Sequence, residues 1–125
     1  MDYKILIADD EPEIRNLLRL YLENENYHVI EAEDGQRALD LLRAEQPALC
    51  ILDIMMPKID GYTATRVIRS TNRQDAKAIP IIAMTAHVFD EDVKQCLEAG
   101  MNAHLPKPLQ MEKVVSTIAR LCKRK

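Results

Sequence analysis

The sequence predicts an α/β fold in which helices cover both faces of a parallel sheet. Apolar runs too short to form helices alternate strictly with amphipathic segments, which gives five strands and five helices. Most of the short runs also end abruptly on a polar residue, as buried strands do at the rim of a parallel sheet. The 125 residues leave room for one compact domain, 1–125, and not for two.

The first two strands each precede a helix. The apolar run from Ile5 to Ala8 is typical of a buried strand, and Pro12 suits the first turn of the helix after it. Apolar residues follow Pro12 at helical spacing, namely Ile14, Leu17, Leu18, Tyr21 and Leu22. Val29 and Ile30 form a shorter and more polar run, so we expect that strand nearer the edge of the sheet.

The run from Leu49 to Asp53 predicts the central strand. It is apolar, too short for a helix, and ends on a carboxylate shortly before Pro57. A turn at Asp34-Gly35 precedes it and opens a helix lined by Ala38, Leu41 and Leu42. Asp60-Gly61 follows it and opens a third helix, whose inner face carries Tyr62, Thr65 and Ile68.

The last third of the chain repeats the pattern twice. A polar loop over 71–78 leads to an apolar strand over 81–84 that ends on Thr85. The helix expected over 87–98 buries Phe89, Val93, Cys96 and Leu97. Gly100 suits a left-handed cap at its end, and a brief strand over 103–105 follows. The final helix carries an apolar stripe, namely Met111, Val114, Val115, Ile118, Leu121 and Cys122.

Bulk composition excludes several classes of protein. The chain is 47% hydrophobic and 30% charged, as ordinary globular proteins are, and its net charge of -3 gives no general attraction to nucleic acid or an anionic membrane. No apolar run approaches the ~20 residues that span a bilayer, and the first residues do not resemble a signal peptide. The three cysteines lie among apolar neighbours without zinc spacing, which favours buried thiols in a reducing cytoplasm.

Reactive polar residues follow four of the five predicted strands. They are Asp9 with Asp10, Asp53, Thr85 and Lys107. Because the carboxyl ends of parallel strands meet at one edge of the sheet, we expect these side chains to converge there. Carboxylates that converge repel one another unless a hard cation joins them, and Mg²⁺ binds through few carboxylates and several waters. The pattern therefore predicts a magnesium site.

Each of these residues also has a simpler structural interpretation. Asp9 or Asp10 could cap the helix that begins at Pro12, and Thr85 could cap the helix after its own strand. Lys107 could be a surface lysine, and Asp60 is better explained as a turn or cap residue than as a ligand. Asp53 is the exception, because no helix is predicted directly after it. The simpler interpretation must also place all these residues at strand ends by coincidence.

A carboxylate beside Mg²⁺ is suited to accept a phosphoryl group as an aspartyl phosphate. The cation and a lysine neutralise the phosphoryl oxygens, and a threonine hydroxyl donates to one of them. Little further machinery is needed, since phosphoryl transfer depends mainly on positioning and electrostatics.

At this point the whole chain, from Ile5 to the last helix, resembles the receiver domain of two-component response regulators. The residues that carry the resemblance are Asp9-Asp10, Asp53 within Leu-Asp-Ile-Met-Met-Pro, Asp60-Gly61, Met84-Thr85-Ala86 and Lys107-Pro108. The resemblance implies a flavodoxin-like, doubly wound sheet with strand order 2-1-3-4-5. It also implies a cis peptide bond between Lys107 and Pro108.

The resemblance further implies a role for each matching residue. Asp53 is the expected phosphoacceptor, supplied by a histidine kinase or a histidine phosphotransfer domain. Asp10, Asp53 and the backbone carbonyl of Met55 are the expected Mg²⁺ ligands, with Asp9 acting through a water. Lys107 pairs with the phosphoryl group. Thr85 moves toward that group and reorganises the fourth strand, the following helix and the fifth strand.

One position departs from the usual receiver pattern. His104 stands where the family often has Tyr or Phe as a rotating switch residue, and an imidazole there would make the output depend on pH. A strand histidine of this kind also needs no function. Met55 and His87 flank the expected path of an attacking water, and Met55 has no group that could orient that water. A moderately long-lived phosphoryl state is therefore expected.

Three other functions share part of this pattern. Phosphatases that form an aspartyl phosphate resemble an Asp-x-Asp pattern after the first strand, whereas this chain has adjacent acids there. A flavodoxin-like electron carrier needs a Ser/Thr/Gly-rich phosphate loop at that place, and a scaffold that is never phosphorylated does not need the full acid set. The expected protein is a cytoplasmic, largely monomeric switch rather than a turnover enzyme, with an unknown output partner.

Overall fold

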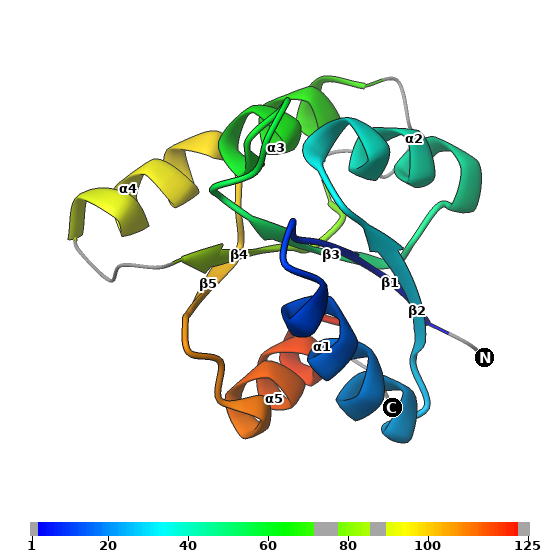
Figure 1. The fold of residues 1–125 in the computed structure, drawn as a ribbon. Helices are drawn as coiled ribbons and strands as arrows, with labels where there is room; N and C mark the ends of the chain where they lie inside the picture. The colour runs from blue at the N-terminus through cyan, green and yellow to red at the C-terminus, as the bar shows by residue number, and fades with distance from the viewer. Residues whose placement is uncertain (1–2, 72–77, 86–89, 123–125) are drawn as a thin grey trace.

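The structure is a computed structural model that describes residues 3–71, 78–85 and 90–122. Strands and helices alternate along the chain (Figure 1). Their bounds are β1 Lys4–Ala8, α1 Pro12–Asn24, β2 His28–Ala32, α2 Gly35–Glu45, β3 Leu49–Asp53, α3 Gly61–Ser70, β4 Ile81–Thr85, α4 Asp90–Ala99, β5 Ala103–Pro106 and α5 Met111–Cys122.

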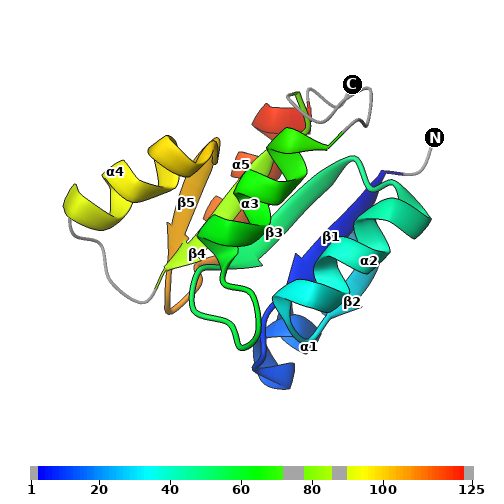
Figure 2. The ribbon, with the colours of Figure 1, turned by 90° about the horizontal axis from the view of Figure 1, so that it is seen from above.

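All strands are parallel and lie in the order β2-β1-β3-β4-β5, which confirms the predicted doubly wound sheet. Helices α1 and α5 cover one face, and α2, α3 and α4 cover the other (Figures 1 and 2). The run of strands from β2 to β5 is visible beneath α2, α3 and α4 in Figure 2. β2 is an edge strand, as predicted, but it is as long as β1 and not shorter.

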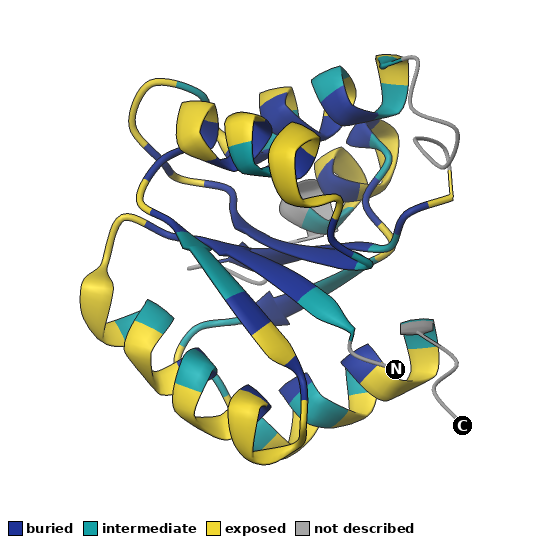
Figure 3. Ribbon diagram, turned by 90° about the vertical axis from the view of Figure 1, so that its right-hand side faces the viewer, coloured by how far each residue is buried: buried dark blue, intermediate teal, exposed yellow. Residues whose placement is uncertain are grey.

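Successive residues of each central strand feed opposite faces of the sheet. Ile5 and Ile7 of β1 pack with Leu18 of α1 and Ile118 of α5. Leu6 and Ala8 pack with the helices on the other face. Every residue of β3 and β4 is buried, whereas the edge strands β2 and β5 are buried only in part, and Figure 3 shows the dark blue of buried residues in the middle of the sheet. The sheet is therefore a rigid layer whose strand ends are held in fixed register.

Several buried positions were predicted correctly. Thr65 and Ile68 of α3 and Cys96 of α4 are buried, and so is Cys50 of β3. The C-cap at Gly100 has a φ of 106°, the left-handed conformation that glycine tolerates. The peptide bond between Lys107 and Pro108 is cis, as the resemblance implied.

Other positions were predicted wrongly. Leu97 of α4 is 62% exposed, because α4 contacts the rest of the fold mainly through α3 and β5. Leu17 and Tyr21 of α1 are also exposed, since they border an open groove of about 880 Å³ between α1 and α5. The described part of the helix expected over 87–98 runs from Asp90, while residues 87–89, with Phe89, and the middle of the loop over 71–78 lie outside the described residues.

Candidate functional site

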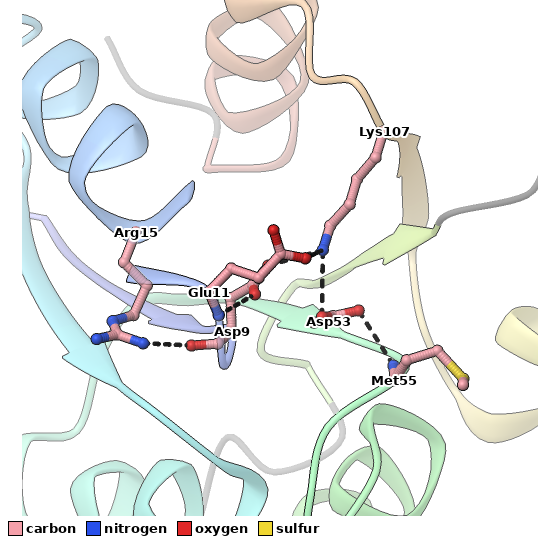
Figure 4. A network of polar contacts seen from close by, with 6 residues as sticks. All are labelled: Asp9, Glu11, Arg15, Asp53, Met55 and Lys107. Carbon is pink, nitrogen blue, oxygen red and sulfur yellow. Dashed lines mark hydrogen bonds and ion pairs between the residues drawn. The ribbon is translucent and has the colours of Figure 1, made fainter. Parts of the chain in front are cut away.

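The predicted site residues gather at the edge of the sheet where the strands end. Asp9 and Asp10 directly follow β1, Asp53 is the last residue of β3, and Thr85 is the last residue of β4. Lys107 directly follows β5. Because the four strands are parallel neighbours, their carboxyl ends bring residues that are far apart in the sequence to one place (Figure 4).

The three carboxylates form one compact cluster. Asp9, Asp10 and Asp53 each offer an oxygen, and these oxygens lie within 4.8 Å of one another. Asp9 is fully buried and Asp53 is only 4% exposed, whereas Asp10 is exposed. Burial raises the pKa of Asp53, and the nearby charge of Asp9 adds to that rise. A hydrogen bond from Met55 and the charge of Lys107 oppose it. Ionised Asp53 is therefore energetically costly in this protein without a further cation.

Lys107 is the cation that faces this cluster in the structure. Its Nζ lies 3.0 Å from Oδ2 of Asp9 and 3.2 Å from Oδ2 of Asp53. Glu11, which sequence reasoning did not single out, lies 3.6 Å away on the same Nζ (Figure 4). Burial by itself lowers the pKa of Lys107, but hydrogen bonds and attraction to Asp9 and Asp53 outweigh it and raise the pKa. Lys107 is thus held charged, and the idea of a merely solvent-exposed lysine is wrong.

The backbone after Asp53 is shaped by its contact with α3. The N–H of Met55 donates to Oδ1 of Asp53 at 3.1 Å, while the Met55 side chain is 72% exposed and points away (Figure 4). A Cβ at Gly61 would lie 2.6 Å from the Asp53 carbonyl oxygen, so only glycine lets the start of α3 approach the end of β3 this closely. This approach fixes the backbone between Asp53, the last residue of β3, and the start of α3.

Among the described residues, Thr85 carries a buried polar atom that has no hydrogen-bond partner. Its hydroxyl is buried and makes no hydrogen bond within the part of the chain that the structure describes. Its carbonyl accepts a hydrogen bond of 2.7 Å from the Lys107 N–H, which joins the ends of β4 and β5. A buried hydroxyl without a hydrogen bond costs free energy, and a ligand that accepted a hydrogen bond from it would remove that cost.

The capping interpretations have different outcomes. Asp60 caps α3, accepting a 2.7 Å hydrogen bond from the Thr63 N–H, as the simpler interpretation predicted. Neither Asp9 nor Asp10 caps α1, whose N-cap is Glu11 without a side-chain hydrogen bond. Asp9 instead accepts a hydrogen bond from the Glu11 N–H at 2.8 Å.

The two predicted histidines lie differently with respect to the described structure. His104 is half-buried in β5, where it pairs with Ala83 of β4. It lies beside the strand that ends in Thr85. His87 lies outside the described residues.

The cluster fits a hard divalent cation. All its ligand atoms are carboxylate oxygens, which Mg²⁺ prefers, and the exposed Asp10 leaves one side open to the waters that Mg²⁺ keeps. Three carboxylates against a single lysine also leave an excess of negative charge, which a cation would neutralise. Among the described residues, no helix is both long and apolar enough to cross a membrane.

Comparison with known proteins agrees with this geometry. Residues 5–119 match the response regulator receiver domain family. The chain is 41% identical over 121 residues to the transcriptional regulatory protein ResD of Bacillus subtilis, covering 97% of this chain and 48% of ResD. It is 36% identical over 124 residues to the response regulator MprA of Mycolicibacterium vanbaalenii, covering 99% of this chain and 52% of MprA. The chain therefore spans about half the length of these relatives.

Solved structures give the same result. A putative response regulator from Chloroflexus aurantiacus superposes with a TM-score of 0.92 at 30% identity, covering 99% of this chain and 100% of that one. The receiver domain of the sensor histidine kinase PA1611 from Pseudomonas aeruginosa, solved with magnesium in its active-site cleft, gives a TM-score of 0.89 at 30% identity and covers 99% of this chain and 100% of that one. The chain belongs to the response regulator receiver domain family of two-component systems, whose members are phosphoryl-accepting signalling switches.

Proposed function

We propose that Asp53 is the phosphoacceptor of this receiver and takes its phosphoryl group from a phosphohistidine of a histidine kinase or a phosphotransfer domain. The observation that carries the proposal is the position of Asp53. It is a nearly fully buried carboxylate at a strand end, 3.2 Å from the ammonium of Lys107 and within one cluster with two further acids. No capping or packing role explains that position.

Asp10, Asp53 and the backbone carbonyl of Met55 are the proposed Mg²⁺ ligands, and Asp9 acts through a water. The different roles proposed for Asp9 and Asp10 follow from their different exposure and contacts. Asp10 faces solvent, whereas Asp9 is fully buried and already engaged by Lys107 and the Glu11 N–H. When bound, Mg²⁺ supplies the positive charge that the carboxylates and the phosphoryl oxygens need.

The chain's own residues perform the rest of the transfer. An oxygen of Asp53 forms a bond to phosphorus while the bond from phosphorus to the donor's imidazole nitrogen breaks. The electron pair returns to the imidazole, which leaves neutral when its other nitrogen carries a proton. The Met55 N–H, already 3.1 Å from Asp53, keeps the carboxylate oriented. Lys107 then follows the charge from the carboxylate onto the phosphoryl oxygens.

Thr85 and His104 carry the proposed relay to α4, β5 and α5. The unpartnered hydroxyl of Thr85 gains a phosphoryl oxygen as its partner, and that gain favours a displaced β4 terminus. Because the Thr85 carbonyl accepts from the Lys107 N–H, the displacement also reaches β5. His104 lies on β5 where the change would be read. His104→Phe is expected to keep phosphorylation but alter partner affinity, and equal affinity in both phosphorylation states would remove His104 from the relay.

Labelling with acetyl phosphate and Mg²⁺, read by intact mass, tests the proposal. The wild-type chain should gain one phosphoryl group that chelation of Mg²⁺ prevents. Asp53→Asn should gain none, while the matched control Asp60→Asn, which keeps a good helix cap on the same edge, should be labelled like the wild type. A label that persists in Asp53→Asn would exclude Asp53 as the acceptor.

The same assay separates the switch from the rival functions. A phosphatase would turn over many equivalents of a phosphate ester without accumulating label, and a scaffold would show no label at all. The family is one of signalling domains, and we propose no turnover activity beyond assistance to the chain's own phosphorylation and dephosphorylation.

The setting of the switch is also a proposal. We infer a single cytoplasmic receiver unit over 1–125 that is largely monomeric, with at most a weak or phosphorylation-dependent dimer. It acts through an output partner or domain and not by direct contact with nucleic acid, and its net charge of -3 supports that inference. Sizing chromatography with and without beryllofluoride, which mimics the phosphoryl group, tests the oligomeric state.

A further inference from the structure

The backbone of Asp9 is anchored on every side. Its N–H donates to the Ala32 carbonyl of β2 at 3.1 Å, and its carbonyl accepts from Nη1 of Arg15 at 2.6 Å (Figure 4). Its Oδ1 accepts from the Glu11 N–H at 2.8 Å. The turn that carries two of the three clustered acids is therefore held by α1 and by an edge strand that contributes no site residue of its own.

Arg15 is itself fixed by Glu31 of β2. Nε of Arg15 lies 3.1 Å from Oε1 of Glu31, and Nε of Arg19 lies 2.7 Å from Oε2 of the same carboxylate. The Arg15 and Glu31 side chains are 17% and 28% exposed, so solvent screens their attraction only in part. One guanidinium thus bridges a carboxylate on β2 and the carbonyl of Asp9. No local sequence pattern predicts this bridge, because Arg15, Glu31 and Asp9 belong to different parts of the chain.

We infer that Arg15 and Glu31 are positioning residues for the cation site, acting through the turn at Asp9 and Asp10. Mg²⁺ demands nearly ideal octahedral geometry, so a ligand turn that is free to move binds it less tightly than one that is held. Groups that orient metal ligands commonly change metal affinity by 10- to 100-fold when they are removed. The inference rests on the proposed Mg²⁺ site and goes beyond it by naming the residues that tune its affinity.

Charge and geometry make opposite predictions for Arg15. If Arg15 acted only through its charge, its removal would take a positive group away from the cation site and Mg²⁺ would bind more tightly. If Arg15 positions the Asp9 carbonyl, its removal frees the turn and Mg²⁺ binds more weakly. The sign of the change in Mg²⁺ affinity therefore separates the two explanations. Glu31→Gln weakens binding on either account and serves as a supporting variant.

Calorimetric titration of the unphosphorylated full chain with MgCl₂ tests the inference. Arg15→Met should raise the Mg²⁺ dissociation constant about 10-fold. Arg15→Lys keeps the charge and one donor but not the bridge, so its Mg²⁺ dissociation constant should lie between those of Arg15→Met and the wild type. Arg43→Met removes the same charge from an exposed position on α2 and should change nothing.

Denaturant unfolding of each variant supplies the structural readout. If Arg15→Met does not fold, Arg15→Lys provides the folded test protein, because charge alone predicts an unchanged Mg²⁺ affinity for it and positioning predicts a weaker one. Unchanged or tighter Mg²⁺ binding by folded Arg15→Met, or unchanged binding by Glu31→Gln, would overturn the inference while leaving the Mg²⁺ site in place. Failure of the wild-type chain to bind Mg²⁺ would overturn the site itself, so the two failures are distinguishable.

Discussion

Two polar clusters lie at opposite ends of the strands, one at the amino ends and one at the carboxyl ends. They differ in how completely their groups are paired by hydrogen bonds and ion pairs. At the amino edge, Arg69 of α3 donates to the Gly100 carbonyl at 2.7 and 3.0 Å and to the Ile79 carbonyl at 2.7 Å. It also donates to Oδ1 of Asn102 at 2.9 Å, an atom that accepts from the Ile81 N–H as well. Burial lowers the pKa of Arg69, and its hydrogen bonds to these oxygens offset the cost of that burial.

At the carboxyl ends of the strands the groups are only partly satisfied. Three clustered carboxylates and Glu11 face a single ammonium, and the Thr85 hydroxyl beside them has no hydrogen bond in the described structure. The first cluster is complete and holds three segments together. The second is incomplete, and we expect it to gain stability when the proposed cation or phosphoryl group binds. The two clusters differ in whether their polar groups have all their hydrogen-bond and ion-pair partners. This difference, and not charge or burial alone, separates the structural cluster from the candidate functional one.

The largest expected effect is on the complete cluster. Arg69→Met should lower the free energy of unfolding by about 3 kcal/mol, because the part-buried carbonyls of Gly100 and Ile79 lose their donor together. Urea unfolding measures the change. Arg66→Met, on the exposed face of the same helix, is the control and should stay within about 0.5 kcal/mol of the wild type. Equal effects of the two substitutions would mean that the Arg69 cluster is dispensable.

The incomplete cluster should respond to metal. Mg²⁺ at ten times its dissociation constant should stabilise the wild-type chain by roughly 1.4 kcal/mol, and excess EDTA should remove that gain. Arg69→Met should show the same gain from its lower starting stability, because its cluster lies at the other edge. A gain that disappears in Arg69→Met would show that the two edges are coupled and not independent.

Neutralising the acceptor should have the opposite sign from removing Arg69. Without metal, Asp53→Asn is expected to raise the free energy of unfolding by about 1 kcal/mol, since it relieves the burial of a charge and its repulsion by Asp9. Denaturant unfolding in EDTA at neutral pH measures the gain. A loss of stability would mean that Lys107 more than offsets the buried charge of Asp53, and the comparison would fail.

The smallest expected effect is on the pH dependence of stability. Because the pKa of Asp53 is raised in the folded protein, this group contributes to the free energy of unfolding at pH below its ordinary pKa of 3.8. That contribution is lost as the pH rises through the higher pKa of the folded state. Asp34 accepts the Arg37 N–H at 2.8 Å, which lowers its pKa, so its contribution is present above 3.8 and lost as pH falls through its folded pKa. The free energy of unfolding is measured against pH for the wild type, Asp53→Asn and Asp34→Asn. The difference between the wild type and each variant should change with pH in opposite directions for the two variants.

Most of the fold and the convergence of the site could be predicted from the sequence. Strict alternation of short apolar runs and amphipathic segments determines a parallel sheet, and parallel strand ends bring Asp9, Asp53, Thr85 and Lys107 together. These inferences depend only on local periodicity and on topology. Both are written along the chain, so no knowledge of side-chain contacts was needed.

The parts that sequence reasoning missed depend on which surfaces meet. Leu17 and Tyr21 lie on the apolar stripe of α1, yet they are exposed because α5 covers only part of that stripe. Leu97 is exposed for a similar reason on α4. Arg15 pairs with Glu31, 16 residues away on β2, and Arg69 donates to the Gly100 carbonyl, 31 residues away. A charged residue on a helix gives no local signal of such a distant partner.

The order of synthesis gives the Lys107 contact a further consequence. Asp9, Asp10 and Asp53 leave the ribosome early, whereas the lysine that neutralises them follows the last strand of the sheet. A nascent chain that has paired β1 with β3 therefore carries three crowded acids before Lys107 is available to pair with Asp9 and Asp53. Mg²⁺ bound at the proposed site would take the place of Lys107 during that interval and would favour assembly of the sheet.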